Sequence, residues 1–465
     1  MSIEKAHTQL PAVSHPAFAG VIGIARRDIT PPIGIYARNW GAALHETAEG
    51  IHRPLTATAV TLQTSEDSVP AIILALDLGW WRSFHDEWYV RKYLLDALNI
   101  DSRRVMICLS HTHAGPVICR ADVDKPGGEL IGPYLDSVRQ TLVDVVKEAL
   151  ASAGPGRLEW RYGACGLAKN RDLKDPDSHR YLCGYNPEGQ ADDTLLVGRI
   201  TDDAGLMRGV IVNYACHPTT LAWENKLISP DFVGSMRELV EQTTGSGICL
   251  YLHGASGELA PAHQYTADTE VVDGHGRELG YAVLSTIAGM AAPDTQLRYA
   301  GAEESGAPLA VWRKQAQSDA ASDRLVCHQI DVEYRLQEMP ILEALDALIR
   351  GCSDRVTVER LTRKRRIREA LGSKETAHVP AWIWEVGGAV LIGHPNEAYS
   401  ELQQEVRRAF PDRAIGVMNV VNGHFGYLPP TDLYREDIYP VWQTPFGPGG
   451  LEHLIETCIH RIETF

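Results

Sequence analysis

Four short loops, each directly after an apolar strand-like run, carry the side chains in this sequence that could bind a metal ion. The first reads Ser-His-Thr-His-Ala-Gly-Pro and follows the apolar run 105–109. Histidines at positions i and i+2 of an extended segment point the same way, so His111 and His113 could both reach one ion. Because a lone His-x-His pair also occurs by chance, the pair alone does not establish a metal site.

The three other loops add donors of different kinds. His217 lies in Asn-Tyr-Ala-Cys-His-Pro, where the proline ends the strand and favours extended or turn geometry at the histidine. Glu397 follows the apolar run 389–392, and Tyr427 lies in the glycine-flanked loop Asn-Gly-His-Phe-Gly-Tyr. Such oxygen donors are acceptable to zinc. Each side chain also has a structural interpretation: a buried histidine bonded to backbone, a helix-start carboxylate and a core aromatic residue.

Strand and helix signals alternate along the chain and predict an α/β architecture. The clearest helix begins at Pro133 and ends before Gly-Pro-Gly at 154–156. A second helix is expected from Phe232 to Gly245, with Asp231 either as its N-cap or as a residue that orients a metal ligand. The expected buried strands are 69–78, 105–109, 209–214, 248–252, 389–392 and 415–421.

No linker rich in glycine, serine or proline divides the chain, so we expect a single domain over residues 1–465. Residues 300–380 differ in character from the rest, and we expect them to form an insertion or cap within that domain. Their basic tract, Arg360 to Lys374, is interpreted as a solvated helix face. The alternative is that the tract faces an anionic ligand or a neighbouring subunit.

Composition and charge are those of a globular protein and argue against several kinds of partner. Hydrophobic residues make up 44% of the chain and the net charge is −16, which disfavours a nucleic-acid or anionic-membrane footprint. We find neither the apolar core of a secretory signal nor a run of about 18 apolar residues that could span a membrane. The nine cysteines are scattered, so reduced thiols are expected. We therefore predict a cytoplasmic protein, and a homo-oligomer stays open.

Taken in order, these motifs and several others resemble the neutral, non-lysosomal ceramidase family. The resemblance covers roughly residues 20–300 and 380–465, and the ordered set is more specific than any single motif. Besides the Glu397 turn, the set comprises Gly-Ile-His at 50–52, Asp-Leu-Gly at 77–79, SHTHAGP at 110–116, KNRDL at 169–173, LISPD at 227–231, GASGELAP at 254–261 and GHFGYLPP at 423–430.

The resemblance implies an α/β fold with a mixed β-sheet core flanked by helices, and a zinc-dependent hydrolase in which activated water attacks an amide carbonyl. The zinc ligands that it implies are His111, His217, Glu397 and Tyr427. His113 would lie beside the metal, as a proton carrier or as a supporting residue. Arg171 and Tyr439 match the residues that polarise the carbonyl. We expect the catalytic domain alone, without the C-terminal β-sandwich domain of full-length ceramidases.

Two positions depart from the ceramidase pattern. Ala260 replaces a serine that positions substrate, and Glu258 replaces an uncharged amide. Glu258 is therefore a candidate catalytic carboxylate near the site, or alternatively a surface loop charge. These departures weaken the lipid assignment more than the zinc assignment, because a fold and its metal can persist while the pocket changes. We expect a small or polar substrate with an amide, lactam, lactone or ester bond.

Two other functions remain compatible with the sequence. The same scaffold could be a metal-dependent esterase, lactonase, lyase or isomerase, or a metal-binding protein without catalytic activity. The donors would also accept iron or manganese. A serine hydrolase is disfavoured because no Gly-x-Ser-x-Gly motif follows a strand.

Overall fold

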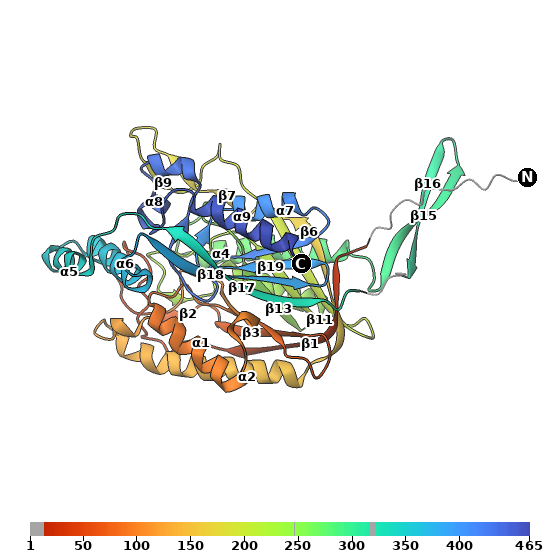
Figure 1. Cartoon of the computed structure of the whole chain (residues 1–465), viewed down its shortest axis with the longest axis horizontal. Coiled ribbons are helices and arrows are strands. Elements are labelled where there is room, and N and C mark those ends of the chain that lie inside the picture. The colour runs from red at the N-terminus through yellow and green to blue at the C-terminus, as the bar shows by residue number, and fades with distance from the viewer. Residues whose placement is uncertain (1–13, 246, 317–320) are drawn as a thin grey trace, which may run out of the picture.

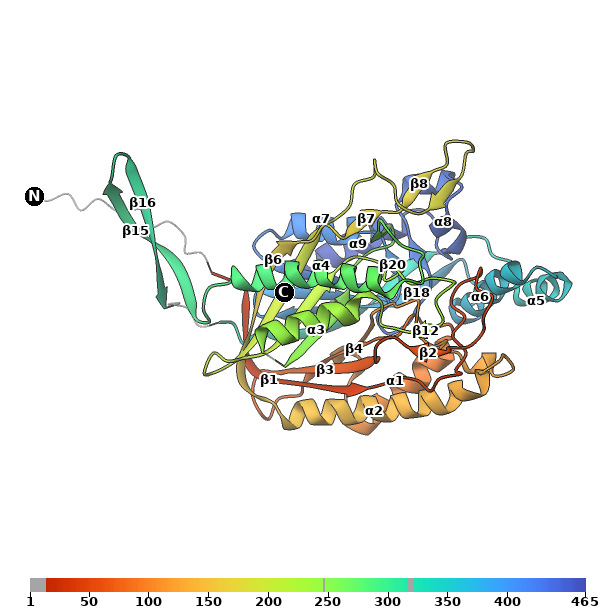
Figure 2. The ribbon, with the colours of Figure 1, turned by 180° about the vertical axis from the view of Figure 1, so that it is seen from behind.

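Two β-sheets packed face to face form the centre of the molecule, and helices cover their outer faces (Figures 1 and 2). The computed structural model describes residues 14–245, 247–316 and 321–465. The larger sheet has the order β13-β11-β10-β6-β1-β3-β4-β5 and the smaller one β17-β18-β19-β21. Both sheets contain parallel and antiparallel pairs, so the predicted mixed-sheet α/β fold is confirmed.

The strands of the two sheets have the following bounds. The larger sheet comprises β1 (Ala17–Asp28), β3 (Thr56–Gln63), β4 (Ala71–Leu76), β5 (Val105–Leu109), β6 (Gly154–Ala164), β10 (Thr194–Asp202), β11 (Met207–Tyr214) and β13 (Ile248–His253). The smaller sheet comprises β17 (Leu325–Arg335), β18 (Thr376–Val386), β19 (Ala389–Gly393) and β21 (Ala414–Met418).

Alternating side chains along each strand build the layers. In β5, Val105, Ile107 and Leu109 pack against the outer helices, whereas Met106 and Cys108 pack between the sheets. This is the period of two that a strand imposes when both of its faces are buried. The outer face of the larger sheet is covered by α1 (Phe84–Leu98), α2 (Ile131–Ala151), α3 (Phe232–Thr244) and α4 (Thr269–Ala288). The smaller sheet is covered by α7 (Glu401–Ala409) and α9 (Gly450–Glu463).

All the expected strands and both expected helices are present, with small changes at their ends. The strand expected over 415–421 stops at Met418, because Val420 and Asn422 have positive φ angles of 56° and 52°, which end an extended segment. Asp231 caps α3 by accepting the backbone N–H of Phe232 at 2.8 Å. The N-cap interpretation of this residue is therefore confirmed.

Residues 300–380 contain three different structures. β15 (Thr295–Glu304) and β16 (Pro308–Ala316) form a hairpin that projects from the body, while α5 (Leu342–Gly351) and α6 (Arg355–Leu371) lie at the opposite end (Figures 1 and 2). Between them in sequence, β17 pairs with β18 in the smaller sheet. The division of the chain into a domain and a cap stays a prediction.

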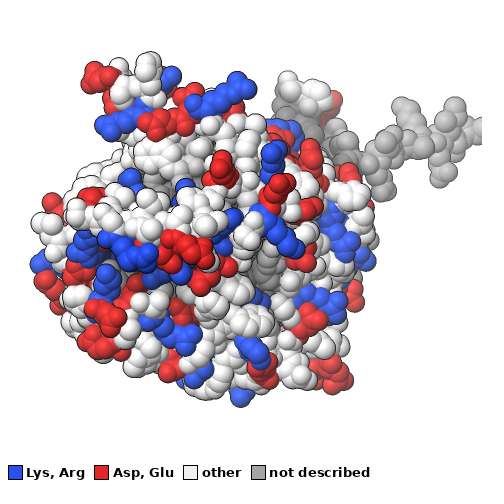
Figure 3. Space-filling model, turned by 60° about the vertical axis from the view of Figure 1, so that its left-hand side comes forward, with Lys and Arg blue, Asp and Glu red and all other residues white. Residues whose placement is uncertain are grey.

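The basic tract on α6 is only partly solvated. Basic and acidic side chains are interspersed on the face that carries this helix (Figure 3). Arg360 is exposed there, but Arg363 and Arg366 are half-buried and Arg368 is buried. The interpretation as a plain solvated face is therefore wrong for these three residues. Helix α6 packs against a loop of the main body, where the side chains of Arg366 and Asp122 are 2.8 Å apart.

Several two- or three-residue strands tie the loops together. They are β2 (Gly50–Ile51) with β12 (Leu227–Ile228), β7 (Ala168–Asn170) with β14 (Leu259–Pro261), β8 (Asp172–Lys174) with β9 (Tyr181–Cys183), and β20 (Glu397–Ala398) with β22 (Tyr427–Leu428). A short helix, α8 (Tyr439–Gln443), follows. All nine cysteines are free thiols. Within the described ranges, no helix has the length and apolar character needed to cross a membrane.

Candidate metal centre

The four predicted donor loops meet at one place because both sheets end there. His111 follows β5 and His217 follows β11, while β19 and β21 of the smaller sheet lead into the loops of Glu397 and Tyr427. A parallel pairing of β20 with β22 sets Glu397 directly opposite Tyr427. Ligand sites of open α/β sheets lie outside the carboxyl ends of their strands, and this position fits that pattern.

Three histidines and one carboxylate form the centre of the site. Ring nitrogen atoms of His111, His113 and His217 all lie within 4.8 Å of one another. The Glu397 Oε2 atom lies 3.0 Å from Nε2 of His217 and 3.3 Å from Nε2 of His111. His111, His217 and Glu397 are buried. The structure thus brings three of the four predicted ligands together, with His113 beside them.

Backbone carbonyl groups orient two of the rings. Nδ1 of His217 lies 2.7 Å from the Ser256 carbonyl oxygen, and Nδ1 of His111 lies 3.1 Å from that of Gly79. Each carbonyl can accept the Nδ1 proton, which leaves Nε2 free to bind an ion, as is usual for metal-ligating histidines. His111 also has a φ angle of 67°, a strained conformation that occurs at functional sites.

Unsatisfied nitrogen atoms give an independent test of whether a metal fits. Among the described residues, both ring nitrogens of His113 are buried without a hydrogen-bond partner, and Nε2 of His111 is buried with only the Glu397 carboxylate near it, at 3.3 Å. Buried polar atoms nearly always have a partner, so such atoms need an explanation. A divalent ion bound by imidazole nitrogens and a carboxylate oxygen would supply that explanation, and these donors suit zinc.

Arg171 connects Tyr427 to the histidine cluster. Its Nη2 group donates a hydrogen bond to Tyr427 Oη at 3.0 Å and to the Gly257 carbonyl at 2.8 Å, and lies 3.2 Å from Nε2 of His217. The ring of Tyr439 is 5.6 Å from the ring of Tyr427. Arg171, Tyr427 and Tyr439 therefore lie together at one side of the cluster, and the role of Arg171 and Tyr439 in polarising a carbonyl stays a prediction. Direct ligation by Tyr427 stays a prediction.

Burial sets the protonation of the cluster. Burial and the Arg171 charge lower the pKa of His217 to about 3, and burial lowers that of His113 well below its usual value. Both rings are thus neutral at pH 7, which is the form that binds metals. For Glu397, burial acts to raise the pKa, but the three neighbouring histidines outweigh it and hold the pKa well below its usual value. The site therefore presents neutral imidazoles at His113 and His217 and an anionic carboxylate at Glu397.

The sequence analysis did not select two further histidines at the site. His253 is the last residue of β13, and its ring is 5.3 Å from that of His111. Nε2 of His424 lies 2.7 Å from Glu397 Oε1. His253 carries the same signal as the others, a histidine at the end of an apolar run. His424 was visible within the Tyr427 loop, but nothing in the sequence distinguished it from a structural histidine.

Glu258 is buried close to the site, so its interpretation as a surface charge is wrong. Both of its carboxylate oxygens accept the Ser400 backbone N–H at 3.0 Å, and the Ser400 hydroxyl also binds the carboxylate. Burial raises the pKa of Glu258 to about 7. Its carbonyl oxygen accepts the backbone N–H of Arg171 at 2.8 Å. Glu258 therefore positions the Arg171 backbone, and a catalytic role for its carboxylate stays a prediction.

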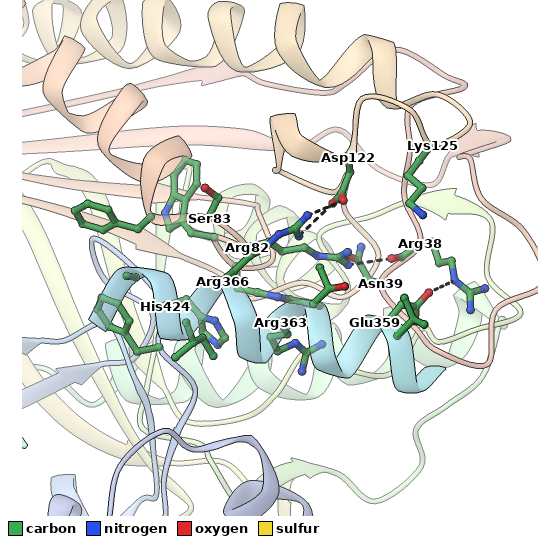
Figure 4. A pocket seen from close by; sticks show the side chains of 18 of the residues that line it. Arg38, Asn39, Arg82, Ser83, Asp122, Lys125, Glu359, Arg363, Arg366 and His424 are labelled. Atoms are coloured by element: carbon green, nitrogen blue, oxygen red, sulfur yellow. Dashed lines mark hydrogen bonds and ion pairs between the residues drawn. The ribbon is translucent and has the colours of Figure 1, made fainter. Parts of the chain in front are cut away.

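A cavity of about 150 Å³ lies beside the histidine cluster, between α6 and the loops of the body (Figure 4). Trp80 and His424 line it. The Trp80 ring lies 4.8 Å from the ring of His113 and 5.6 Å from that of His111, so this indole lines the cavity and also contacts the cluster. On the other side of His113, the ring of Trp40 lies 5.0 Å away. Aromatic walls thus enclose His113.

Comparison with known proteins supports the predicted resemblance. No protein family model matches the chain. The chain is 23% identical to the neutral ceramidase of Pseudomonas aeruginosa over 490 aligned positions, which cover 94% of this chain and 72% of that protein. The crystal structure of neutral ceramidase from Pseudomonas aeruginosa matches with a TM-score of 0.67 at 17% identity, covering 96% of this chain and 74% of that one.

A second solved structure, a ceramidase complexed with C2, matches with a TM-score of 0.66 at 17% identity and covers 97% of this chain and 76% of that one. The similarity extends over nearly the whole chain and includes the fold. The resemblance to neutral ceramidases that the motifs predicted is thereby confirmed.

Proposed function

We propose that this homologue of neutral ceramidase is a zinc-dependent hydrolase that cleaves an amide bond of a small or polar substrate. One observation carries the proposal: His111, His113, His217 and Glu397 meet in a buried cluster that contains imidazole nitrogens without partners. Each such nitrogen costs free energy when it is left unsatisfied, and an ion bound there would remove that cost.

The residues that would hold the ion are those that the sequence predicted. His111, His217 and Glu397 offer Nε2 and carboxylate atoms on one side, and Tyr427 offers a phenol oxygen beside Arg171. Zinc, when bound, supplies a Lewis acid that brings the pKa of water close to neutrality. Burial of the neighbouring groups keeps competing solvent away and strengthens every charge interaction in the site.

The remaining site residues account for the proton and charge transfers of amide hydrolysis. Attack on the carbonyl creates an oxyanion, and the Arg171 guanidinium group is the nearest cation that could stabilise it. The Tyr439 hydroxyl, next to Tyr427, is the second candidate donor. His113 has two unpaired ring nitrogens and is the candidate that takes a proton from water and delivers it to the leaving nitrogen.

Ceramide itself is a poor fit to the departures from the family pattern. Ala260 is buried in β14 and offers no hydroxyl where the ceramidase pattern has a serine. The neighbouring cavity is small and carries several charged side chains, among them Arg82, Arg363 and Asp122. Charged walls favour a polar substrate over two long alkyl chains, because a charged group that loses its water without gaining a partner is costly.

The proposal is tested by metal analysis together with a matched panel of short-chain amides, esters and lactones. We expect near-stoichiometric zinc, loss of amide hydrolysis on chelation and its return when zinc is added. Hydrolysis in labelled water places one labelled oxygen in the acid product, whereas a lyase would incorporate none. Full activity in metal-free protein would contradict the proposal. His460→Ala, which replaces an exposed histidine on α9, serves as the control and keeps its zinc and activity.

A further inference from the structure

Two arginines in the cavity beside the histidine cluster form no ion pair with any carboxylate in the part of the chain that the structure describes. We propose that the substrate is an amide carrying an oxyanion group, and that Arg82 and Arg363 bind this group while the amide carbonyl lies at the metal centre. The inference rests on the proposed function and specifies its substrate class. The proposed group is a carboxylate, and a phosphate shares the same recognition chemistry.

The position of the two arginines links the cavity to the reacting centre. The guanidinium carbons of Arg82 and Arg363 lie 5.3 Å and 6.0 Å from the centre of the Trp80 ring. That same ring contacts His111 and His113, as described above. Figure 4 shows Arg82, Arg363 and His424 around the cavity, with α6 running past them. One substrate could therefore reach both the arginines and the metal centre.

Ion pairing satisfies only some of the cavity's basic residues. Arg38 is paired with Glu359 at 2.9 Å, as Arg366 is with Asp122. In contrast, Arg82 forms no ion pair with any described carboxylate and donates its Nη2 hydrogen bonds to the Arg38 carbonyl and to the Asn39 side chain.

Arg363, like Arg82, forms hydrogen bonds but no ion pair with a described carboxylate. It donates to the Tyr439 hydroxyl at 3.2 Å and to Gln443 Oε1 at 2.9 Å, and no carboxylate of the described chain pairs with it. Lys125 also lines the cavity without a described ion pair. The cavity thus has excess positive charge in a protein whose net charge is −16.

The arginines also repel one another. Burial is the main cause that lowers the pKa of Arg82; the charge of Asp122 raises it, and the smaller effects of the Arg363 and Arg366 charges lower it. Holding like charges together in a site with little water is unfavourable unless an anion joins them. A substrate oxyanion would remove this cost on binding, so the cavity discriminates against neutral amides.

The shape of the guanidinium group indicates which anion fits. Its planar fork donates two parallel hydrogen bonds to a carboxylate or a phosphate. Arg363 also contacts Tyr439, the residue proposed to polarise the carbonyl. An anion bound at Arg363 would therefore fix the distance between the charged end of the substrate and the bond to be cleaved. Substrates would have to match that distance.

The first test compares matched substrates. N-acetylglycine and N-acetylglycinamide have nearly the same size and differ in charge, and N-acetylaminomethylphosphonate provides the phosphate-like arm; longer homologues of all three vary the distance to the amide. We expect kcat/KM to be about 10- to 100-fold higher for the anionic member of the best series, as expected for charge-assisted hydrogen bonds. A preference for the carboxylate over the phosphonate, or the reverse, identifies the natural oxyanion.

Variants assign that preference to the arginines. In Arg82→Gln the ratio of kcat/KM for the anionic and neutral members should fall toward one, and in Arg82→Lys it should be intermediate, because the charge remains but the fork is lost. Arg360→Gln is the control, since Arg360 is exposed on α6, the helix that carries Arg363, and does not line this cavity. An unchanged ratio in Arg82→Gln, or turnover of neutral amides as fast as of anionic ones, overturns the inference and leaves the proposed hydrolase standing.

A binding measurement separates failure of the anion site from failure of the hydrolase. Calorimetric titration of the intact protein with glutarate, compared with neutral pentane-1,5-diol, needs no turnover. Binding of glutarate that Arg82→Gln weakens about 10-fold or more supports the anion site even when no amide is hydrolysed, in which case the proposed amide chemistry alone is wrong. Glutarate binding that does not depend on Arg82 overturns the anion site.

Discussion

The histidine cluster and the arginine-lined cavity lie next to each other but are built in opposite ways. The cluster is formed by residues at strand ends of both sheets, and backbone carbonyls fix the rings of His111 and His217. The cavity is lined by long, half-buried side chains such as Arg82 and Arg363, which come from a loop and from α6. If the proposed functions are correct, the reacting centre is part of the fold, whereas substrate recognition is assembled around it. Mutations should therefore have different consequences in the two regions.

Replacing a central histidine should have the largest effect. In His217→Ala the proposed metal site loses a ligand and Glu397 loses a neighbour 3.0 Å away. We expect loss of most of the bound zinc and a fall in kcat/KM of about 10³-fold or more, the scale at which an enzyme loses its metal-activated nucleophile. Elemental analysis and amide kinetics measure the two effects. If zinc and activity both persist, the cluster is not the reacting centre and the contrast between the regions disappears.

Arg171→Gln tests whether stabilisation of the oxyanion can be removed without loss of metal binding. The substitution removes the cation beside His217 and Tyr427, so we expect kcat to fall about 10²- to 10³-fold, as for the loss of one oxyanion donor. Zinc content should stay near that of the unmodified protein.

The matched control for this variant is Arg199→Gln, which alters an equally buried arginine that pairs with Glu159 in the larger sheet. It should lower the melting temperature, because a broken buried ion pair leaves an unpaired charge, but kcat should change little. If Arg171→Gln behaves like this control, Arg171 has a structural role and does not stabilise the transition state.

Glu258→Gln measures how much the ionisation of a buried carboxyl next to the cluster lowers the free energy of unfolding. The folded-state pKa of Glu258 is raised to about 7 from 4.5, so between those values the folded chain binds a proton that the unfolded chain has lost. The contribution of this carboxyl to the free energy of unfolding is therefore fully present below pH 4.5 and is lost as pH rises toward 7.

Glutamine cannot ionise, so it avoids that loss. Relative to the unmodified protein, Glu258→Gln should gain stability between pH 5 and pH 8, by up to about 3 kcal/mol. Chemical denaturation at the two pH values measures the gain. Glu188→Gln, at an exposed position, should show no such pH dependence. An equal difference at both pH values would show that Glu258 titrates normally.

The same contrast explains how much the sequence could predict. The strands and the helices α2 and α3 follow from apolar periodicity, and the ends of those strands pointed to His111, His217 and Glu397. The convergence of these residues needed the family resemblance, because nothing local in the chain states that β5 and β11 of one sheet end beside β19 and β21 of another. His253 carried the same strand-end signal and could have been included.

The cavity could not be predicted in this way. Arg82 and Arg363 are nearly three hundred positions apart, and neither belongs to a motif. The charge run at 360–374 indicated a helix. Which face of that helix packs against the body depends on tertiary contacts such as the pairs Arg366–Asp122 and Arg38–Glu359. Long side chains in a half-buried setting leave no periodic signal, since their charged ends can face either solvent or a cavity.

The smallest effect is expected for Arg366→Gln, which tests whether the cavity wall contributes to the fold. Its ion pair with Asp122 is partly solvated, with side chains 18% and 11% exposed, and partly exposed pairs of this kind contribute roughly 0–1 kcal/mol. We expect the free energy of unfolding to fall by no more than about 1 kcal/mol and zinc content to be unchanged. In the control Arg360→Gln the free energy of unfolding should change even less. Denaturation curves and elemental analysis measure both. A loss of several kcal/mol, or of zinc, would mean that α6 supports the cluster, so that recognition and chemistry share one structural unit.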